Sequence, residues 1–460
     1  MDQTQNAEQT EQAVLKRDDW PSPGRAYWGL TVLTIALMVA TLDRSIISLL
    51  VEPIKADLNL SDTQFSLLTG FAFVFFYAFL GLPIARLADV KSRRVIIGVG
   101  IAFWSFATML CGLAQNFWHL FWARVGVGAG ESSFAPATYS IITDSFPPEK
   151  LPRAFAINSL GFIAGAGISN LAGGAIITAA TAVGVINLPF LGELKPWQLV
   201  FILVGLPGFI VAAMMATVEE PKRKGQLKQS GGKAKAIPIR EIFGYLKQER
   251  RTYAPMFMSL AVKVLLSYGA VLWLPALFIR THDWTAAKIA FVLGMLSLIT
   301  APLGLWLGST ISERWAKAGR NDAYMRLVLY ASIGLMPFAI AYPLVDNAWL
   351  AIVLYGFNTF IASIGIAPGN AALQVVTPAE MRGQVRALYQ FVFNVVGYAA
   401  GPLVIALFTD YLFGAEDQLR YSMALLACIL APTACLVTWI GVKPYGESYA
   451  RAMARYAAGA

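Results

Sequence analysis

Long apolar runs that recur along the whole chain constrain its fold more than any other feature of the sequence. A helix needs roughly 20 mostly apolar residues to cross a bilayer, and twelve such runs follow one another here. Each run is far longer than a strand of a membrane barrel, so the sequence predicts an all-α integral membrane protein. The predicted spans are residues 27–50, 64–86, 94–114, 118–143, 153–179, 197–218, 253–279, 286–310, 326–345, 348–375, 384–410 and 420–441.

The overall composition also places the chain in the membrane. It is 57% hydrophobic and 14% charged, whereas soluble globular proteins are about 25% charged. A net charge of +9 is compatible with nucleic-acid binding, but that function gathers the charge on one soluble face. Here Lys and Arg are spread over short loops between apolar runs. We therefore expect no nucleic acid partner.

Cysteine and histidine are too sparse for a metal site or a disulfide framework. Cys111, Cys428 and Cys435 all lie inside apolar runs, where thiols pack as small hydrophobic groups. His119 and His282 have no cysteine or second histidine at ligand spacing. We expect no metal and no cofactor. The spans also lack a catalytic constellation, which argues against a membrane enzyme.

The distribution of basic residues predicts the orientation of the chain. Cytoplasmic loops carry an excess of Lys and Arg, and most basic residues fall on the side of the N-terminal tail, so we expect both termini in the cytoplasm. Apolar residues at helical spacing in 239–246 predict an amphipathic helix at the cytoplasmic interface. The predicted units are a tail at 1–26, a six-helix bundle at 27–218, a linker at 219–252, a second six-helix bundle at 253–441 and a tail at 442–460.

The two predicted bundles resemble each other. Residues 81–89, at the end of the second span, are echoed by 304–312 at the end of the eighth. The stretch "PPEKLPRA" after the fourth span is echoed by "TPAEMRG" after the tenth. A duplicated six-helix unit is typical of transporters whose halves rock around a central cavity to give alternating access.

Four charged residues lie deep in the first bundle. Asp43 and Arg44 are in the first span, and Arg124 and Glu131 are in the fourth, two helical turns apart or roughly 10.5 Å along the axis. Asp43 lies level with Arg124 and is expected to pair with it, while Glu131 lies nearer the midplane. Neighbours in a helix point about 100° apart, so Arg44 can engage a different partner, Glu131. Intramembrane charges are usually functional, and protonating a carboxylate frees its arginine, so we interpret the four as a proton-coupling site. A static ion-pair network joining the two spans is the alternative.

Further residues are candidates for lining a substrate cavity. Lys263 lies near the midplane of the seventh span, roughly 15 Å from its start, where it can meet an anionic substrate group or a carboxylate of the other bundle. Ordinary helix packing is the alternative role for the uncharged candidates. The predicted substrate-binding residues are Lys263, Arg44, Phe73, Tyr77, Tyr139, Tyr268, Asn358 and Asn394.

The loop after the second span carries a family motif. Its sequence "ARLADVKSRR" resembles the cytoplasmic loop signature G-x-L-A-D-R-x-G-R-R of the major facilitator superfamily, with matches at Asp89, Arg93 and Arg94. The resemblance implies two pseudo-symmetric bundles of six helices each. It also implies that this loop takes part in a cytoplasmic gate. The predicted gate residues are Asp89, Arg93, Arg94, Asp144, Arg153 and Arg382.

Within this superfamily, two stretches resemble the Spinster branch. They are "LDRSII" in the first span and "RVGVGAGESSFAPATYSIITDSF" in the fourth. Spinster proteins are implicated in moving sphingolipids and lysophospholipids, and their bacterial members resemble proton-dependent transporters. The resemblance implies proton coupling at Asp43, Glu131, Arg124 and Arg44, and a lipid-like amphipathic substrate. A proton-coupled symporter of small organic anions is the alternative. The protein is expected to be a monomer in a bacterial inner (plasma) membrane, in contact with membrane lipid.

Overall fold

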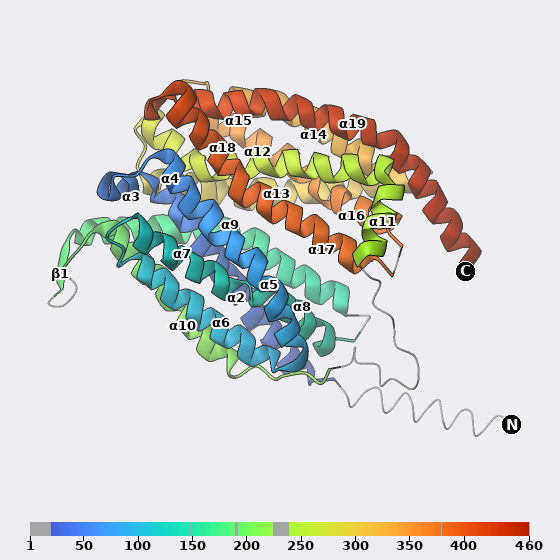
Figure 1. Cartoon of the computed structure of the whole chain (residues 1–460), viewed down its shortest axis with the longest axis horizontal. Helices are drawn as coiled ribbons and strands as arrows, with labels where there is room; N and C mark the ends of the chain where they lie inside the picture. Colours follow the sequence, from blue (N-terminus) through green and yellow to red (C-terminus); the bar gives the residue numbers. More distant parts are fainter. Residues whose placement is uncertain (1–19, 148–149, 189–191, 224–238, 379, 460) are drawn as a thin grey trace.

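The computed structural model describes residues 20–147, 150–188, 192–223, 239–378 and 380–459, which are almost entirely helical (Figure 1). The predicted tail at 1–26 and the linker at 219–252 fall partly outside these residues. The first half of the chain forms α2 (Pro23–Leu49), α3 (Val51–Leu58), α4 (Asp62–Ser66), the π-helical segment η1 (Leu67–Phe71), α5 (Ala72–Val90), α6 (Arg93–Cys111), α7 (Phe117–Glu131), α8 (Phe134–Ser145), α9 (Leu151–Val183), a hairpin of β1 (Ile186–Leu188) and β2 (Gly192–Leu194), and α10 (Pro196–Met215).

The second half of the chain repeats this all-helical plan. A short helix, α11 (Ile239–Gln248), precedes it, and Ile242 of α11 is buried while Phe243 is exposed, as expected of an amphipathic helix. The elements that follow are α12 (Arg250–His282), α13 (Ala286–Lys317), α14 (Ala323–Ala341), α15 (Ala348–Ile364), α16 (Ile366–Val376), α17 (Arg382–Val392), the π-helical segment η2 (Phe393–Ala400), α18 (Gly401–Leu407), η3 (Phe408–Phe413), η4 (Glu416–Gln418) and α19 (Leu419–Gly459).

Local sequence explains several helix boundaries. Ser61 and Gln64 form a reciprocal capping box at the start of α4, in which each side chain accepts from the backbone N–H of the other. Ser92 accepts from the N–H of Val95 at the start of α6, and Asn116 caps α7 in the same way. Side-chain oxygens at these positions satisfy backbone donors that a helix leaves free at its first turn.

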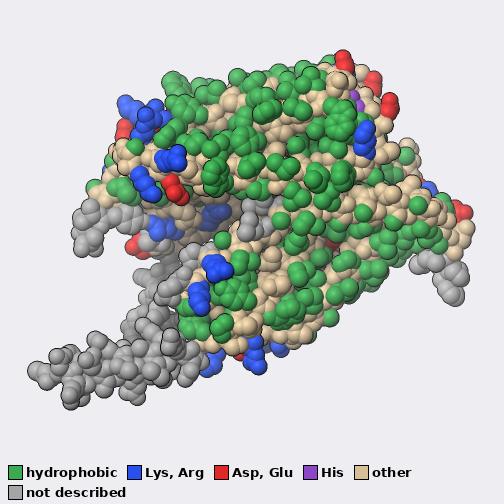
Figure 2. All heavy atoms as spheres, turned by 180° about the vertical axis from the view of Figure 1, so that it is seen from behind, with side chains coloured by type: hydrophobic (Ala, Val, Ile, Leu, Met, Phe, Trp, Pro, Cys, Tyr) green, Lys and Arg blue, Asp and Glu red, His purple; other side chains and the backbone are tan. Residues whose placement is uncertain are grey.

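The predicted membrane spans appear with one difference. Eleven helical stretches of the described residues are long and apolar enough to cross a membrane. The remaining predicted span, 118–143, is divided between α7 and α8, which are separated only by Ser132 and Ser133. The last helix, α19, continues well beyond the predicted end of its span at residue 441. Exposed apolar side chains cover the outer surface of the molecule, as lipid contact requires (Figure 2).

The helices gather into two halves, with α2 to α10 in one and α12 to α19 in the other (Figure 1). We call them the N half and the C half. The end of the molecule at which α2 begins and α19 ends, where α11 also lies, is called the terminal end. The opposite end, which carries α3, α4 and the β hairpin, is called the distal end.

Glycines allow the two halves to approach closely toward the distal end. A Cβ on Gly167 of α9 would lie 3.0 Å from the carbonyl oxygen of Gly294 of α13, and one on Gly294 would lie 2.8 Å from that of Gly167. In the other crossing, η1 packs on η2, and a Cβ on Gly70 would lie 2.7 Å from the carbonyl oxygen of Tyr398. Small residues at helix crossings permit this backbone contact in a membrane. Both π-helical segments at the second crossing are of a kind frequent at functional sites.

Candidate functional site

Arg44 and Glu131 form an ion pair inside the N half. The Nε of Arg44, on α2, donates to Oε2 of Glu131, at the end of α7, over 2.6 Å. The side chain of Glu131 is fully buried, whereas that of Arg44 is 24% exposed. The structure thus brings together two residues that the sequence analysis expected to pair, and it leaves the arginine as the partner that can still reach water or a ligand.

Asp43 has no direct hydrogen bond to Arg124, unlike the pairing expected from their depths. Among the described residues, both carboxylate oxygens of Asp43 are buried without a hydrogen-bond partner, as are Nε of Arg124 and Oγ1 of Thr108. These residues lie in the interior of the N half: Asp43 is on α2, Arg124 on α7 and Thr108 on α6. Burying a charge without a hydrogen bond is costly, so Asp43 is a group whose charge the fold does not satisfy.

Both arginines of the site contact one aromatic ring. The guanidinium groups of Arg44 and Arg124 lie 5.2 and 5.3 Å from the ring centre of Phe73, so both contact this buried ring. Phe73 is held there because its backbone packs on Gly128 of α7, where a Cβ would lie 2.3 Å from the Phe73 carbonyl oxygen. Arginine over an aromatic face is a favourable arrangement. The Arg124 guanidinium thus contacts an aromatic ring, although it was expected to pair with Asp43.

Aromatic residues of both halves continue this site toward the crossing of η1 and η2. Tyr77 stacks on Phe73 and lies 5.5 Å from the Arg44 guanidinium. In the C half, Tyr268 of α12 packs on Tyr398 with ring centres 4.0 Å apart, and on Phe393. Sequence reasoning missed Tyr398 and Phe393, although the aromatic spacing in "FVFNVVGY" was a signal for them.

Other predicted substrate residues lie elsewhere. Tyr139 is 58% exposed and its ring packs beside Phe155 of α9. Lys263 lies on the face of α12 that turns toward α19, where its electrostatic neighbour is Cys435. The hydrogen bond between Ser259 and Thr438, on the same two helices, fixes this rotation of α12. Lys263 has no ion pair with the N half among the described contacts.

Two predicted asparagines lie in the C half with different environments. The Oδ1 of Asn358, on α15, is buried without a hydrogen-bond partner in the described structure. Asn394, on η2, accepts from Gln390 over 3.3 Å. An orphaned buried amide oxygen needs a partner, so Asn358 remains a candidate for ligand contact.

The predicted gate residues of the N half form a network at the terminal end. Buried Arg93 donates to Glu220 over 2.8 Å, to Ser140 over 2.8 Å and to the Pro221 carbonyl over 2.7 Å, and it also bonds Asp144. These contacts tie the start of α6 to α8 and to the chain after α10. Sequence reasoning missed Glu220, although the acidic pair in "VEEPKR" lies just after a predicted span.

This network lowers the pKa of the Glu220 carboxyl. Burial on its own raises the pKa of its carboxyl, but hydrogen bonds from the Arg94 backbone N–H, from Arg93 and from Ser92 outweigh burial and lower the pKa below the ordinary value. Its charged form is therefore stabilised by the fold.

The other predicted gate residues do not join this network in the described contacts. The side chain of Asp89 lies outside the described residues. Arg153 is exposed at the start of α9, and Arg382 of the C half donates to the carbonyl of Thr377 over 3.1 Å.

A cluster of charges joins the two halves at the distal end. We call Glu52, Lys55, Asp62, Arg280 and Glu416 the distal charge cluster. Arg280 of α12 donates two hydrogen bonds of 2.8 Å to Asp62, at the start of α4, and one of 2.8 Å to Glu52 of α3. Lys55 bonds Asp62 and lies 2.8 Å from Glu416. Sequence reasoning missed this cluster because its members belong to predicted outer loops.

Further hydrogen bonds close the same end. The backbone N–H of Thr63 donates to Asp410 over 2.7 Å, and Ser66 donates to the Pro402 carbonyl over 3.2 Å. At the opposite end, the surface is hollowed between the halves, and basic side chains border the hollow (Figure 2). The structure is therefore closed at the distal end and open at the terminal end.

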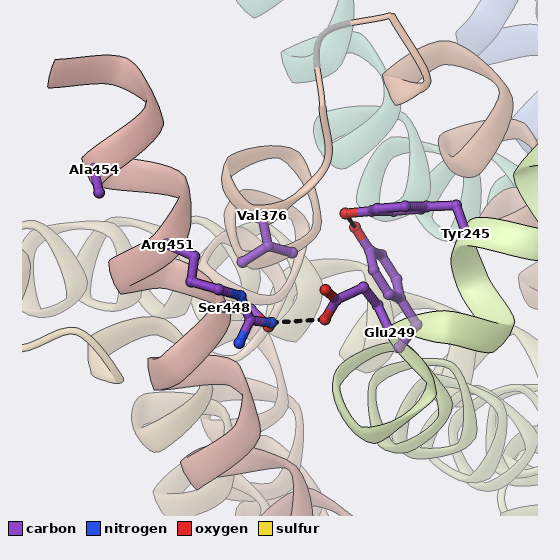
Figure 3. Close-up of a pocket in the computed structure, with 7 residues that line it drawn as sticks. Tyr245, Glu249, Val376, Ser448, Arg451 and Ala454 are labelled. Carbon is purple, nitrogen blue, oxygen red and sulfur yellow. Dashed lines mark hydrogen bonds and ion pairs between the residues drawn. The ribbon is translucent and has the colours of Figure 1, made fainter. Parts of the chain in front are cut away.

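A separate cavity of about 410 Å³ lies at the terminal end, within the C half and α11 (Figure 3). Arg451 of α19 points toward Glu249 and bonds it over 2.7 Å, which ties α19 to the start of α12 (Figure 3). The lining residues are Tyr245, Glu249, Tyr253, Val376, Ser448, Arg451 and Ala454. Groups of three or more metal-ligating side chains do not occur in the part of the chain that the structure describes.

Two membrane-spanning helical halves, joined at one end and open at the other around intramembrane charges, define a multi-pass membrane transporter. A family model described as Major Facilitator Superfamily matches residues 33–402. The chain therefore belongs to the Major Facilitator Superfamily, as its loop motif indicated, and this is a family of transporters rather than enzymes.

Known proteins similar to this chain agree with that assignment. An MFS-type efflux pump of Mycolicibacterium smegmatis is 25% identical, over 94% of this chain and 97% of that protein. Protein spinster homolog 1 of Mus musculus is 25% identical, over 86% of this chain and 76% of that protein. The structure also resembles that of a bacterial homologue of the human lysosomal transporter Spinster in an inward-facing, unoccupied conformation. There the TM-score is 0.76 at 24% identity, over 95% of this chain and 98% of the other. The Spinster resemblance of the sequence is thus confirmed.

Proposed function

We propose that this protein is a proton-coupled secondary active transporter of an amphipathic, lipid-like substrate. It acts as a monomer in a bacterial plasma membrane, with both termini in the cytoplasm. The observation that carries the proposal is the set of four intramembrane charges in the N half. Glu131 is paired with Arg44 there, while Asp43 has no hydrogen-bond partner in the part of the chain that the structure describes. Intramembrane carboxylates next to arginines are typical of proton pathways.

The proton competes with Arg44 for the carboxylate of Glu131. When Glu131 accepts a proton it loses the charge that holds Arg44, and the guanidinium becomes free to bind an anionic group of the substrate. Protonation of Asp43 removes a buried charge that lacks hydrogen bonds, which lowers the cost of keeping α2 and α7 packed around it. Proton loading and substrate binding are therefore linked through Arg44, the only partly exposed member of its pair.

Alternating access follows from the two ends of the molecule. The distal charge cluster and the crossings of α9 with α13 and of η1 with η2 hold the halves together on one side. The hollow at the terminal end gives the site access to the other side, which the positive-inside rule makes the cytoplasm. In the opposite state these contacts separate and the Arg93 network at the terminal end approaches the C half.

Proteoliposomes with an imposed pH gradient test this function. The substrate is a lysophosphatidylglycerol with a fluorescent acyl chain. We expect wild type to accumulate it at the expense of the gradient. Glu131→Gln and Asp43→Asn are expected to abolish gradient-driven accumulation while leaving exchange of labelled for unlabelled lipid, because exchange needs no net proton movement.

Arg326→Gln is the matched control, since it removes a charge from a partly exposed ion pair with Asp322 on α14. It is expected to transport like wild type. Unaltered gradient-driven accumulation in both carboxylate variants would refute proton coupling at this site. Accumulation of a small dicarboxylate in place of the lysolipid would favour the organic-anion alternative.

A further inference from the structure

Polar side chains mark one side of the helix formed by α17 and η2 in the C half. Arg386, Gln390 and Asn394 follow one another at intervals of four residues, which places them along one face. Gln390 and Asn394 are hydrogen-bonded to each other. A polar row on a membrane-spanning helix faces protein or water rather than lipid.

Arg386 is a cation without a carboxylate partner. Its guanidinium donates to Oδ1 of Asn370, on α16, over 2.6 Å and lies 5.9 Å from the ring of Tyr389. No carboxylate lies within ion-pair distance of it among the described residues. Arg44, Arg93 and Arg280 each bond one or more carboxylates. Buried Arg124 of the N half shares with Arg386 the lack of an ion pair among the described residues, but Arg386 is half-buried.

The sequence of this part of the C half supplies no counter-charge. Residues 348–376 and 382–407, which form α15 to α18, contain no Asp or Glu. In the N half, by contrast, the four central charges sum to zero. Buried cations are paired, hydrated or ligand-bound, because an uncompensated charge in a membrane costs free energy.

The bond to Asn370 orients Arg386 without neutralising it. The neutral amide oxygen of Asn370 accepts one N–H of Arg386. The planar guanidinium therefore keeps its full charge and has further N–H donors for a second acceptor. A guanidinium held in this way matches the paired oxygens of a phosphate or carboxylate. The basic side chains bordering the hollow give such an anion an approach from the terminal end (Figure 2).

We propose that Arg386, oriented by Asn370, is the anion-binding group of the C half and selects a single-chain amphiphile with an anionic headgroup. Gln390 and Asn394 supply hydrogen bonds further along the same face. This inference rests on the proposed function and specifies the charge of its substrate.

Equilibrium binding to the full-length protein in nonionic detergent tests the inference. The probes are lysophosphatidylglycerol, which is anionic, and lysophosphatidylcholine of the same chain length, which is zwitterionic. Wild type is expected to bind the anionic lipid more tightly. Arg386→Gln is expected to weaken that affinity about tenfold, the loss of one charge-assisted contact, and to leave the zwitterionic lipid within about twofold. Arg386→Lys keeps the charge without the fork and should lie between.

Matched controls separate the site from general charge effects. Arg326→Gln removes an equal charge from α14 and should leave both affinities unchanged. Equal losses for the two lipids in Arg386→Gln, or the same loss in Arg326→Gln, would overturn the proposal. An equally large, Arg386-dependent affinity for two-chain phosphatidylglycerol would also overturn it, because the site would then recognise a bilayer lipid. Binding needs no proton gradient, so failure of proton coupling in proteoliposomes leaves this readout intact.

Discussion

The distal charge cluster is expected to set the balance between the two states of the transporter, and Arg280→Gln is the perturbation that tests this. Asp62, which is fully buried, receives two hydrogen bonds from Arg280 and one from Lys55. Glu52 receives the third hydrogen bond from the Arg280 side chain. All of these bonds to Arg280 cross from one half to the other, so they exist only while the distal end is closed.

The magnitude follows from the burial of the partners. Removing one member of a buried ion pair costs about 3–5 kcal/mol. Lys55 still bonds Asp62 in Arg280→Gln, and Glu52 is 28% exposed and can be hydrated, so we take about half of that cost, roughly 2 kcal/mol. Because about 1.4 kcal/mol corresponds to a factor of ten, the ratio of distal-closed to distal-open molecules should fall about 30-fold.

Distances between spin labels measure this ratio. In a variant whose three native cysteines are replaced by serine, one pair of labels is placed at the distal end, at Val183 and Tyr411. A second pair is placed at the terminal end, at Val90 and Lys317. All four side chains are exposed and lie outside the cluster. Arg280→Gln is expected to lengthen the distal distance and shorten the terminal one in double electron–electron resonance.

Arg420→Gln is the control, because Arg420 bonds Asp346 over 2.8 Å within the C half and does not cross to the N half in the described contacts. It should leave both distance distributions unchanged. The reasoning is refuted if Arg280→Gln leaves the distributions as in wild type, or if the control shifts them equally.

Two further predictions concern the stability of the N half. Glu220 has a lowered pKa in the folded state, so its stabilising charge is fully present above the ordinary glutamate pKa and is lost as the pH falls through the lower folded-state value. Wild type should therefore melt at a higher temperature than Glu220→Gln. The difference between the two melting temperatures should be constant above about pH 5 and shrink below about pH 4; a difference independent of pH would contradict this. Gly128→Ala places a Cβ against the Phe73 backbone and should destabilise the protein by about 1–3 kcal/mol. Gly383→Ala, at a position with open space, is its control, and equal melting temperatures would contradict the packing argument.

The depth of the charged residues could be predicted from the sequence, but their partners could be predicted only in part. Arg44 was expected to engage Glu131, because neighbours in a helix can engage different partners, and the two residues pair. Asp43 and Arg124 were placed at one level, yet the described structure shows no hydrogen bond between them, and the Arg124 guanidinium contacts the ring of Phe73. Counting residues gives the height of a side chain along its helix but not the direction in which that side chain points or the groups that it contacts.

Lys263 illustrates the same limit for the direction of a side chain. Its depth in α12 follows from its position in the apolar run, but the rotation of α12 turns it toward Cys435 of α19. That rotation depends on contacts such as the one between Ser259 and Thr438, 179 residues apart. The distal charge cluster could not be predicted from the sequence for a related reason. Glu52 and Arg280 are separated by 228 residues and meet only in one arrangement of the halves.

The sequence by itself determined that the chain crosses a membrane as helices, where most spans lie, that the unit is duplicated and that Asp43, Arg44, Arg124 and Glu131 lie deep in the first bundle. These properties depend on local composition, because each apolar run must by itself be long enough to cross the hydrocarbon core and must satisfy its own backbone hydrogen bonds as a helix. Only the tertiary structure decided that the distal end is closed, that Asp43 lacks a hydrogen-bond partner among the described residues and that Arg386 is held by an amide. Those features depend on the rotation and packing of helices from distant parts of the chain, which lipid, equally apolar on every side, does not specify.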